Sequence, residues 1–211
     1  MIDYILLFFA LSMLGWLVEV LEGIVNRKEF INRGFLVGPI CPIYGFGSLL
    51  MLNFLRAYEE DYIVLFIMGM IISTILEYLT SLILEKIFHT RWWDYSDHKI
   101  NLNGRVALET MVMFGLSSIL LMKLIKPFYF NFINVIPNNI KLIIVIIFII
   151  IFVIDIAFSI SVIIKIKKNK LIKNIDCTRE VKKHIKNNII KRNYLIRRLL
   201  KSFPLLRGKK D

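Results

Sequence analysis

Polar residues are what this sequence most lacks. Hydrophobic residues fill 57% of its 211 positions and charged residues only 21%, which leaves too few polar side chains to coat a soluble domain of this length. Apolar runs of about 18 residues or more recur along the chain, and such runs indicate helices in a bilayer. A backbone in lipid must satisfy its own hydrogen bonds, so each run predicts a helix. The runs do not alternate as the strands of a membrane barrel do, which excludes that class.

Cysteines and catalytic motifs are also scarce. The two cysteines, Cys41 and Cys177, lie in an apolar run and in the basic C-terminal region, so we expect free thiols rather than a disulfide framework. No Walker A or G-x-S-x-G sequence occurs, so any ATP would have to be hydrolysed by another chain. No spacing matches a helical metal-ligand pair, and we predict neither a metal nor another cofactor. No basic segment precedes the first apolar run, which we expect to remain as a signal anchor.

The apolar runs predict an all-α, polytopic membrane helix bundle of about five transmembrane helices. The expected spans are residues 4–25, 34–55, 62–88, 105–122 and 142–164. Residues 123–137, with two lysines and two prolines, predict the loop before the last span.

The second expected span is interrupted. Gly38-Pro39 and Cys41-Pro42 follow each other within it, and a proline removes a backbone donor and clashes with the preceding turn. We therefore expect a broken or re-entrant segment near 38–42, followed by a helix over about 43–55. Irregular backbone at membrane depth is tolerated only against protein or a watery cavity.

Basic charge is concentrated at the C-terminus. Residues 165–211 hold 17 Lys and Arg against three acidic residues, whereas the preceding 164 residues hold 11 basic and 13 acidic ones. We predict a transmembrane domain over 1–165 and a cytoplasmic tail over 166–211, partly an amphipathic helix. Such a helix can lie on anionic lipid, and the aromatic or motif support that a nucleic-acid partner would require is lacking.

Lys and Arg in short loops set the orientation. The basic tail places the C-terminus on the cytoplasmic side of the cell membrane. If the interrupted segment spans, the first and third loops are cytoplasmic and the N-terminus lies outside; if it is re-entrant, the N-terminus lies inside.

Ionisable side chains at membrane depth are costly, and each invites a functional interpretation. Glu19 and Glu22 share a helix face at i, i+3, and Arg105 and Glu109 could pair at i, i+4. Together with the neighbouring loops, these residues define a candidate polar cluster that could bind a cation or a phosphate-bearing group, or carry protons: Glu19, Glu22, Asn32, Arg33, Glu77, Arg91, Asp94, Asn103, Arg105 and Glu109. No catalytic residue is assigned among them.

A purely structural interpretation stands beside the functional one. Acids near helix ends can extend to the interface at low cost, and ion pairs that only hold a bundle together would leave the same pattern; Glu77 is deeper. Asp155 is deep as well and has no obvious basic partner, so we expect a local hydrogen bond with Ser159 and nothing more.

Several motifs in the first part of the chain resemble one family. They include Gly15–Trp16–Leu17–Val18–Glu19, the run from Asn32 to Gly47 with Gly38–Pro39–Ile40–Cys41–Pro42, Leu76–Glu77–Tyr78, Arg91–Trp92–Trp93–Asp94–Tyr95–Ser96 and Asn101–Leu102–Asn103–Gly104–Arg105. Over residues 4–125 the chain resembles the CmpB family, which is catalogued as type IV ABC-transporter permeases and is grouped with a eukaryotic transmembrane protein family. The resemblance implies a permease with no assigned substrate.

Three functions remain open at this point. The first is a permease-like subunit that works as an oligomer or with a separate ATPase, since interrupted helices often line substrate sites. The second is a membrane-embedded enzyme that acts on a lipid or lipid-linked phosphate at the cytoplasmic face, because carboxylates beside arginines suit acid–base chemistry. The third is a non-catalytic assembly or regulatory factor.

Overall fold

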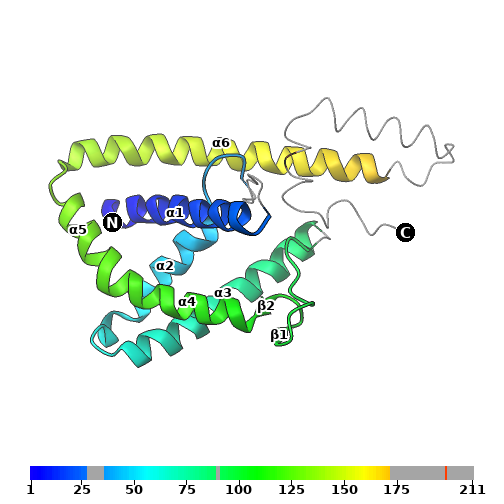
Figure 1. Ribbon diagram of the computed structural model, residues 1–211. Coiled ribbons are helices and arrows are strands. Elements are labelled where there is room, and N and C mark those ends of the chain that lie inside the picture. The colour runs from blue at the N-terminus through cyan, green and yellow to red at the C-terminus, as the bar shows by residue number, and fades with distance from the viewer. Residues whose placement is uncertain (28–35, 89–90, 172–197, 199–211) are drawn as a thin grey trace. The chain divides into compact units, whose positions relative to one another are not determined.

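The computed structural model describes residues 1–27, 36–88, 91–171 and 198 (Figure 1). Its internal contacts divide the chain into two compact units. The first unit comprises residues 1–15 and 41–147, and the second comprises 16–40 and 148–211. Each unit is described below by itself.

Among the residues that the structure describes, four helical stretches are long and apolar enough to cross a membrane: residues 2–25, 62–88, 108–133 and 138–161. They belong to α1 (Ile2–Arg27), α3 (Tyr62–Phe88), the succession α4 (Leu108–Leu120), η2 (Leu121–Ile125) and α5 (Lys126–Ile133), and α6 (Asn138–Leu171). The predicted fold class, an all-α membrane helix bundle, is confirmed. The chain is a multi-pass membrane protein.

The interrupted segment is built as its prolines predict. Residues 36–40 are not helical, and α2 (Pro42–Phe54) begins with proline in its first turn, where the missing N–H costs nothing. At about 20 Å, α2 is too short to cross a bilayer alone, so it is not among the four long stretches. It runs antiparallel to the start of α1: the Cys41 N–H donates to the Ser12 carbonyl at 2.9 Å, and the Phe8 and Phe46 rings meet at 4.9 Å.

Helices α3 and α4 pack side by side through small residues (Figure 1). A Cβ added to Gly69 would lie 2.3 Å from the Ser118 Oγ, so the two helices approach as closely as glycine permits. The Ser118 hydroxyl donates to the Leu65 carbonyl across this contact at 2.6 Å. The apolar core of the first unit adjoins it and joins α1, α2, α3 and η2: Leu7, Leu11, Met51, Leu52, Leu55, Leu65, Leu121 and Met122.

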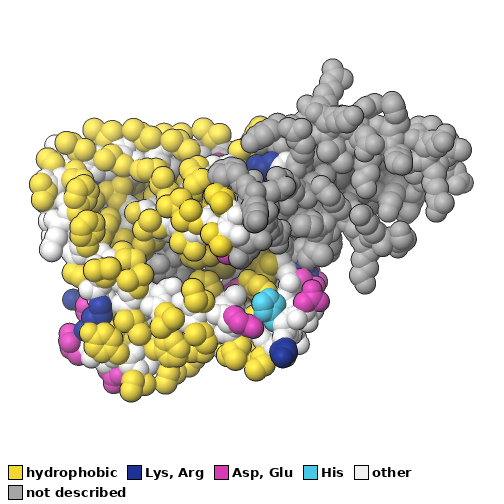
Figure 2. Space-filling model, viewed as in Figure 1, with side chains coloured by type: hydrophobic (Ala, Val, Ile, Leu, Met, Phe, Trp, Pro, Cys, Tyr) yellow, Lys and Arg dark blue, Asp and Glu magenta, His cyan; other side chains and the backbone are white. Residues whose placement is uncertain are grey.

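The exposed surface of these helices suits lipid. Most of the large exposed hydrophobic residues lie on the long helices. Figure 2 shows the outer faces of α3 and α4 as mostly hydrophobic, with acidic and basic side chains gathered at the two ends of these helices. Only 22% of the most apolar part of α3, and of the stretch that contains α4, is buried inside the protein. The bilayer must cover the rest.

The prediction for the fourth span was wrong at both ends. The helix begins at Leu108 rather than at residue 105, because residues 101–107 form a short hairpin. It also continues beyond residue 122 as far as Ile133, through the expected loop. Pro127 lies in the first turn of α5 and follows the π-helical turn η2, which takes up the clash that a proline causes within a helix. The connection to α6 is therefore only residues 134–137.

In the second unit, Asp155 of α6 holds the non-helical backbone of the interrupted segment. Its two carboxylate oxygens accept the N–H groups of Val37 at 2.8 Å and Gly38 at 2.9 Å. The expected contact with Ser159 is present at 3.3 Å, but the expectation that Asp155 does nothing more was wrong. Arg198, from the tail, donates to the Leu36 carbonyl. The predicted amphipathic tail helix otherwise lies outside the described residues.

Candidate functional site

Residues 101–107, which precede α4, form a hairpin at one end of α3 and α4. Strand β1 (Asn101–Leu102) pairs antiparallel with β2 (Val106–Ala107). Asn103 and Gly104 turn the chain with φ of 53° and 68°, which are values that asparagine and glycine adopt most readily. The Asn101 side chain accepts the Gly104 N–H at 2.8 Å. The hairpin thus fixes the backbone position of Arg105, the residue that follows the turn.

Arg105 points from the hairpin onto α3. Its guanidinium forms an ion pair with Glu85 at 2.6 Å and donates to the Ser81 hydroxyl at 3.1 Å. It also lies 5.6 Å from the centre of the Tyr78 ring, within reach of a cation–π contact. The Trp93 indole N–H donates to the Arg105 carbonyl at 2.9 Å and so holds its main chain as well. With its side chain only 13% exposed, Arg105 is the centre of the cluster.

A second arginine binds the same carboxylate. Arg91 Nε donates to the other oxygen of Glu85 at 3.4 Å, and its Nη1 donates to the Asn103 carbonyl at 3.3 Å. Asn103 in turn donates its side-chain N–H to the Tyr78 hydroxyl at 3.1 Å. Glu85 therefore lies between two guanidinium groups, one from the segment before the hairpin and one from the hairpin itself.

Asp94 completes the outer edge of the cluster. The Ser96 hydroxyl donates to it at 2.5 Å and the Ser96 N–H at 3.0 Å, while Arg91 Nη1 lies 3.7 Å from the same oxygen. The hydrogen bond from the Ser96 side chain is the main cause that lowers the pKa of Asp94 below its ordinary value of 3.8; the Ser96 N–H and Arg91 add to it. Asp94 is thus a carboxylate at neutral pH.

Polar side chains continue from this cluster along the buried face of α3. Ser73, Glu77 and Ser81 follow one another at intervals of four residues, the spacing of a ridge on a helix, and Glu85 is the next in the series. Glu77 is only 6% exposed, and its Oε2 lies 3.4 Å from the Thr110 hydroxyl of α4. We call Ser73, Glu77, Ser81 and Glu85 the α3 polar line. It joins the hairpin cluster to the interior of the α3–α4 contact.

A cleft of about 600 Å³ opens beside the outer end of this line. Leu82, Glu85, Lys86 and Arg105 line it. The cleft is open, and three of the four residues that line it carry a charge, two of them cations. Such a lining can receive a small charged group from water, and Arg105 connects that group to the α3 polar line.

Comparison with known proteins gives one match. Residues 6–160 fit the model of a family whose printed description is "Putative ABC-transporter type IV". The chain belongs to this family. The match confirms the resemblance noted from the motifs and extends it to most of α6. No curated protein and no solved structure matches the chain. All ten residues of the predicted polar cluster fall within the family match, and the basic tail does not.

The structure brings half of these ten residues together: Glu77, Arg91, Asp94, Asn103 and Arg105. The expected pairing of Arg105 with Glu109 was wrong, because Arg105 precedes the helix and turns to Glu85. Glu109 is 64% exposed and pairs with His98 at 3.2 Å.

The remaining predicted residues are not placed with the cluster. Glu19 and Glu22 lie on α1 in the second unit, and Asn32 and Arg33 lie outside the described residues. The candidate set from the sequence does not include Glu85, Ser81 or Tyr78, which belong to the cluster in the structure. The interval of four residues from Ser73 to Glu85 is the signal that would have included the first two.

Proposed function

We propose that this protein is the membrane-embedded subunit of a transport system, and that the α3 polar line handles a polar substrate or a coupling ion. Membership of the family supports transport as the class of function. The observation that carries the proposal is Glu77, a buried acid joined by a line of polar side chains to a cleft at the helix end. Because the chain has no nucleotide-binding motif, a separate ATPase would supply the energy.

Glu77 lies deep in the membrane, where burying an acid costs free energy and therefore suggests a function. It lies 11 residues before the end of α3 at Phe88, about 16 Å along the helix axis. That places it near the middle of a hydrocarbon core about 30 Å thick, where an acid is rare and is by default a functional candidate. The neighbouring Thr110 hydroxyl donates to the Ala107 carbonyl at 2.8 Å. The same hydroxyl lies 3.4 Å from the Glu77 Oε2 and can donate to it instead.

The polar line belongs on the cytoplasmic side. Lys126 of α5 pairs with Glu59 at 2.5 Å, and Tyr129 of α5 donates to the Asp3 carbonyl at 2.7 Å. Asp3 also pairs with Lys141 at 2.8 Å, so the start of α1, the end of α2 and the start of α6 share one end of the first unit. Helix α3 begins at that end, shortly after Glu59, so the hairpin that follows its last residue lies at the other end. Basic loops favour the cytoplasm, which orients the hairpin and the tail inward and the N-terminus outward at the cell membrane.

Acid–base catalysis on a lipid phosphate fits the cluster less well. Both oxygens of Glu85 are bound by guanidinium groups, so neither is available to take a proton as a general base must.

A bundle of this size gives little room for a translocation path in one copy. The transport proposal therefore requires either an oligomer or partner chains.

Purification from native membranes in mild detergent tests the proposal. We expect an ATP-hydrolysing subunit to co-purify in a fixed ratio. Glu77→Gln should preserve insertion and partner capture but lower the ATP hydrolysis of the complex in liposomes about tenfold or more. Glu60→Gln, at a carboxylate that is 94% exposed, is the matched control and should leave the rate unchanged. Recovery of the chain alone, with no ATPase, would contradict the proposal.

A further inference from the structure

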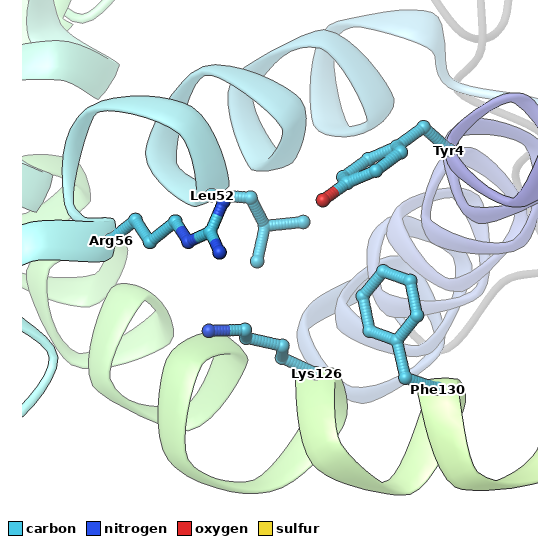
Figure 3. A pocket seen from close by; sticks show the side chains of 5 residues that line it. All are labelled: Tyr4, Leu52, Arg56, Lys126 and Phe130. Carbon is cyan, nitrogen blue, oxygen red and sulfur yellow. The ribbon is translucent and has the colours of Figure 1, made fainter. Parts of the chain in front are cut away.

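A second cavity lies at the opposite end of the first unit from the hairpin. It measures about 230 Å³ and is lined by Tyr4 of α1, Leu52 of α2, Arg56 of η1 (Arg56–Tyr58), and Lys126 and Phe130 of α5 (Figure 3). We call it the Arg56 cleft. None of these residues belongs to the α3 polar line, and none was a candidate from the sequence.

Two cations meet in the Arg56 cleft. Figure 3 shows the Arg56 guanidinium and the Lys126 ammonium reaching toward the same space from different helices. Lys126 is paired with Glu59 at 2.5 Å, whereas Arg56 forms no ion pair or hydrogen bond with any residue that the structure describes. The cleft thus has one cation more than the carboxylate beside it can neutralise. Two like charges that converge in this way repel each other until an anion lies between them.

The rest of the lining adds one polar group and an apolar wall. The Tyr4 hydroxyl points into the cleft (Figure 3). The rings of Tyr4 and Phe130 pack edge to face with their centres 5.6 Å apart, and Leu52 is buried beside them. An occupant would therefore meet cations and a hydroxyl on one side and hydrocarbon on the other. That combination suits the charged group of an amphiphile better than a fully hydrated ion.

The position of the cleft also favours a head group. It lies where α2 ends and α5 begins, and the exposed Tyr58 and Tyr62 follow Arg56 within six residues along the chain. Tyrosines of this kind gather at the level of lipid head groups. The Lys123 ammonium, which pairs with Glu60 at 3.1 Å, lies 5.0 Å from the centre of the Tyr62 ring.

We propose that the Arg56 cleft binds a single phosphate group. Arg56 would hold two phosphate oxygens through its paired N–H donors, which match that geometry. Lys126 would contribute charge, and the Tyr4 hydroxyl one hydrogen bond. The volume of about 230 Å³, about eight times the ~30 Å³ that one water occupies in the liquid, accommodates one phosphate with the first atoms of its ester. The group belongs either to an anionic phospholipid of that leaflet or to a phosphate free in water.

Binding to the intact protein, delipidated in neutral detergent, tests this site. The two arms are titration with phosphatidylglycerol and titration with inorganic phosphate, each followed by the shift in Tm; phosphatidylcholine is the zwitterionic reference. We expect saturable stabilisation in at least one arm, absent with phosphatidylcholine. Arg56→Gln should weaken it about tenfold or more, since hydrogen bonds to charged groups are the strong ones. A response in the first arm identifies a lipid, and one in the second identifies a free phosphate.

Matched variants keep the test decisive. Lys99→Gln removes a cation just before the hairpin, at the other end of the helices, and should leave binding unchanged. Tyr4→Phe removes only a hydroxyl and should weaken binding about threefold to tenfold, which covers the case in which Arg56→Gln fails to fold. The proposal would be overturned if either Arg56→Gln or Tyr4→Phe bound the ligand as tightly as the unaltered protein. It would also be overturned if phosphatidylcholine stabilised the protein as much as phosphatidylglycerol or phosphate does.

Discussion

Asp155 gives the sharpest test of how this chain keeps irregular backbone inside a membrane. Its carboxylate accepts the N–H groups of Val37 and Gly38, which have no helical partner because the segment 36–40 is not helical. A lipid environment offers them no water in exchange. Removing the carboxylate should therefore leave two main-chain donors without an acceptor.

The size of the effect follows from the number of bonds. A hydrogen bond to a charged group contributes about 1.5–3 kcal/mol, so Asp155→Ala should lower the free energy of unfolding by about 3 kcal/mol or more. Asp155→Asn keeps one acceptor oxygen and should lose about half of that amount. Ser159→Ala removes only the contact at 3.3 Å and should cost less than about 1 kcal/mol.

Equilibrium unfolding in detergent by added SDS, followed by circular dichroism, measures these differences. A double-mutant cycle sharpens the assignment: the Cβ of Gly38→Ala would lie 2.9 Å from the Asp155 Oδ2. That substitution should destabilise the natural protein and be tolerated beside Asp155→Ala. If Asp155→Ala changes the free energy of unfolding by less than about 0.5 kcal/mol, or if Asp155→Asn costs as much as Asp155→Ala, the carboxylate does not hold the segment.

Three further predictions concern the first unit. Gly69→Ala puts a methyl group 2.3 Å from the Ser118 Oγ and should destabilise the α3–α4 contact by about 1–3 kcal/mol, measured in the same SDS titration, whereas Gly69→Ala with Ser118→Gly should recover most of the loss. Gly104→Ala combines a φ of 68° with a contact of 2.4 Å to the Ser96 Oγ, and should make the hairpin more easily cleaved by protease while the helices stay intact. The pKa of Asp94 is lower in the folded protein than in the unfolded chain, so its carboxylate stabilises the hairpin above the unfolded pKa of about 3.9. This stability is lost as the pH falls through the lower folded pKa. Cleavage of the hairpin by protease should therefore accelerate below about pH 4, and Asp94→Asn should abolish that pH dependence.

The spans and their interruption could be predicted because each depends on a local property of the sequence. Hydropathy over residues 62–88 gave α3 with the bounds that the structure has, and Pro39 and Pro42 marked the break before α2. Partners could not be predicted in this way. The pairing of Arg105 with Glu109 assumed a helix through both, and the turn at Asn103 and Gly104 sends the arginine to Glu85 instead.

Asp155 was missed for a different reason. Its partners are backbone N–H groups, which every residue except proline carries, so residue types alone give no signal of them. The one trace in the sequence is Gly38, where a side chain would collide with the carboxylate. In the polar cluster, the helical spacing of Ser81 and Glu85 was visible, but only the hairpin shows which arginines reach them.

The π-helical turn η2 determines which way α5 faces. A turn of this kind holds one residue more than an α-helical turn, so everything after it is rotated by about 100° relative to an uninterrupted helix. Lys126 and Phe130 therefore owe their places on the Arg56 cleft to a single additional residue among Leu121–Ile125. Relatives that lack this residue would direct the same lysine and ring toward another side of the helix, so the length of this turn is a natural marker for which family members share the cleft.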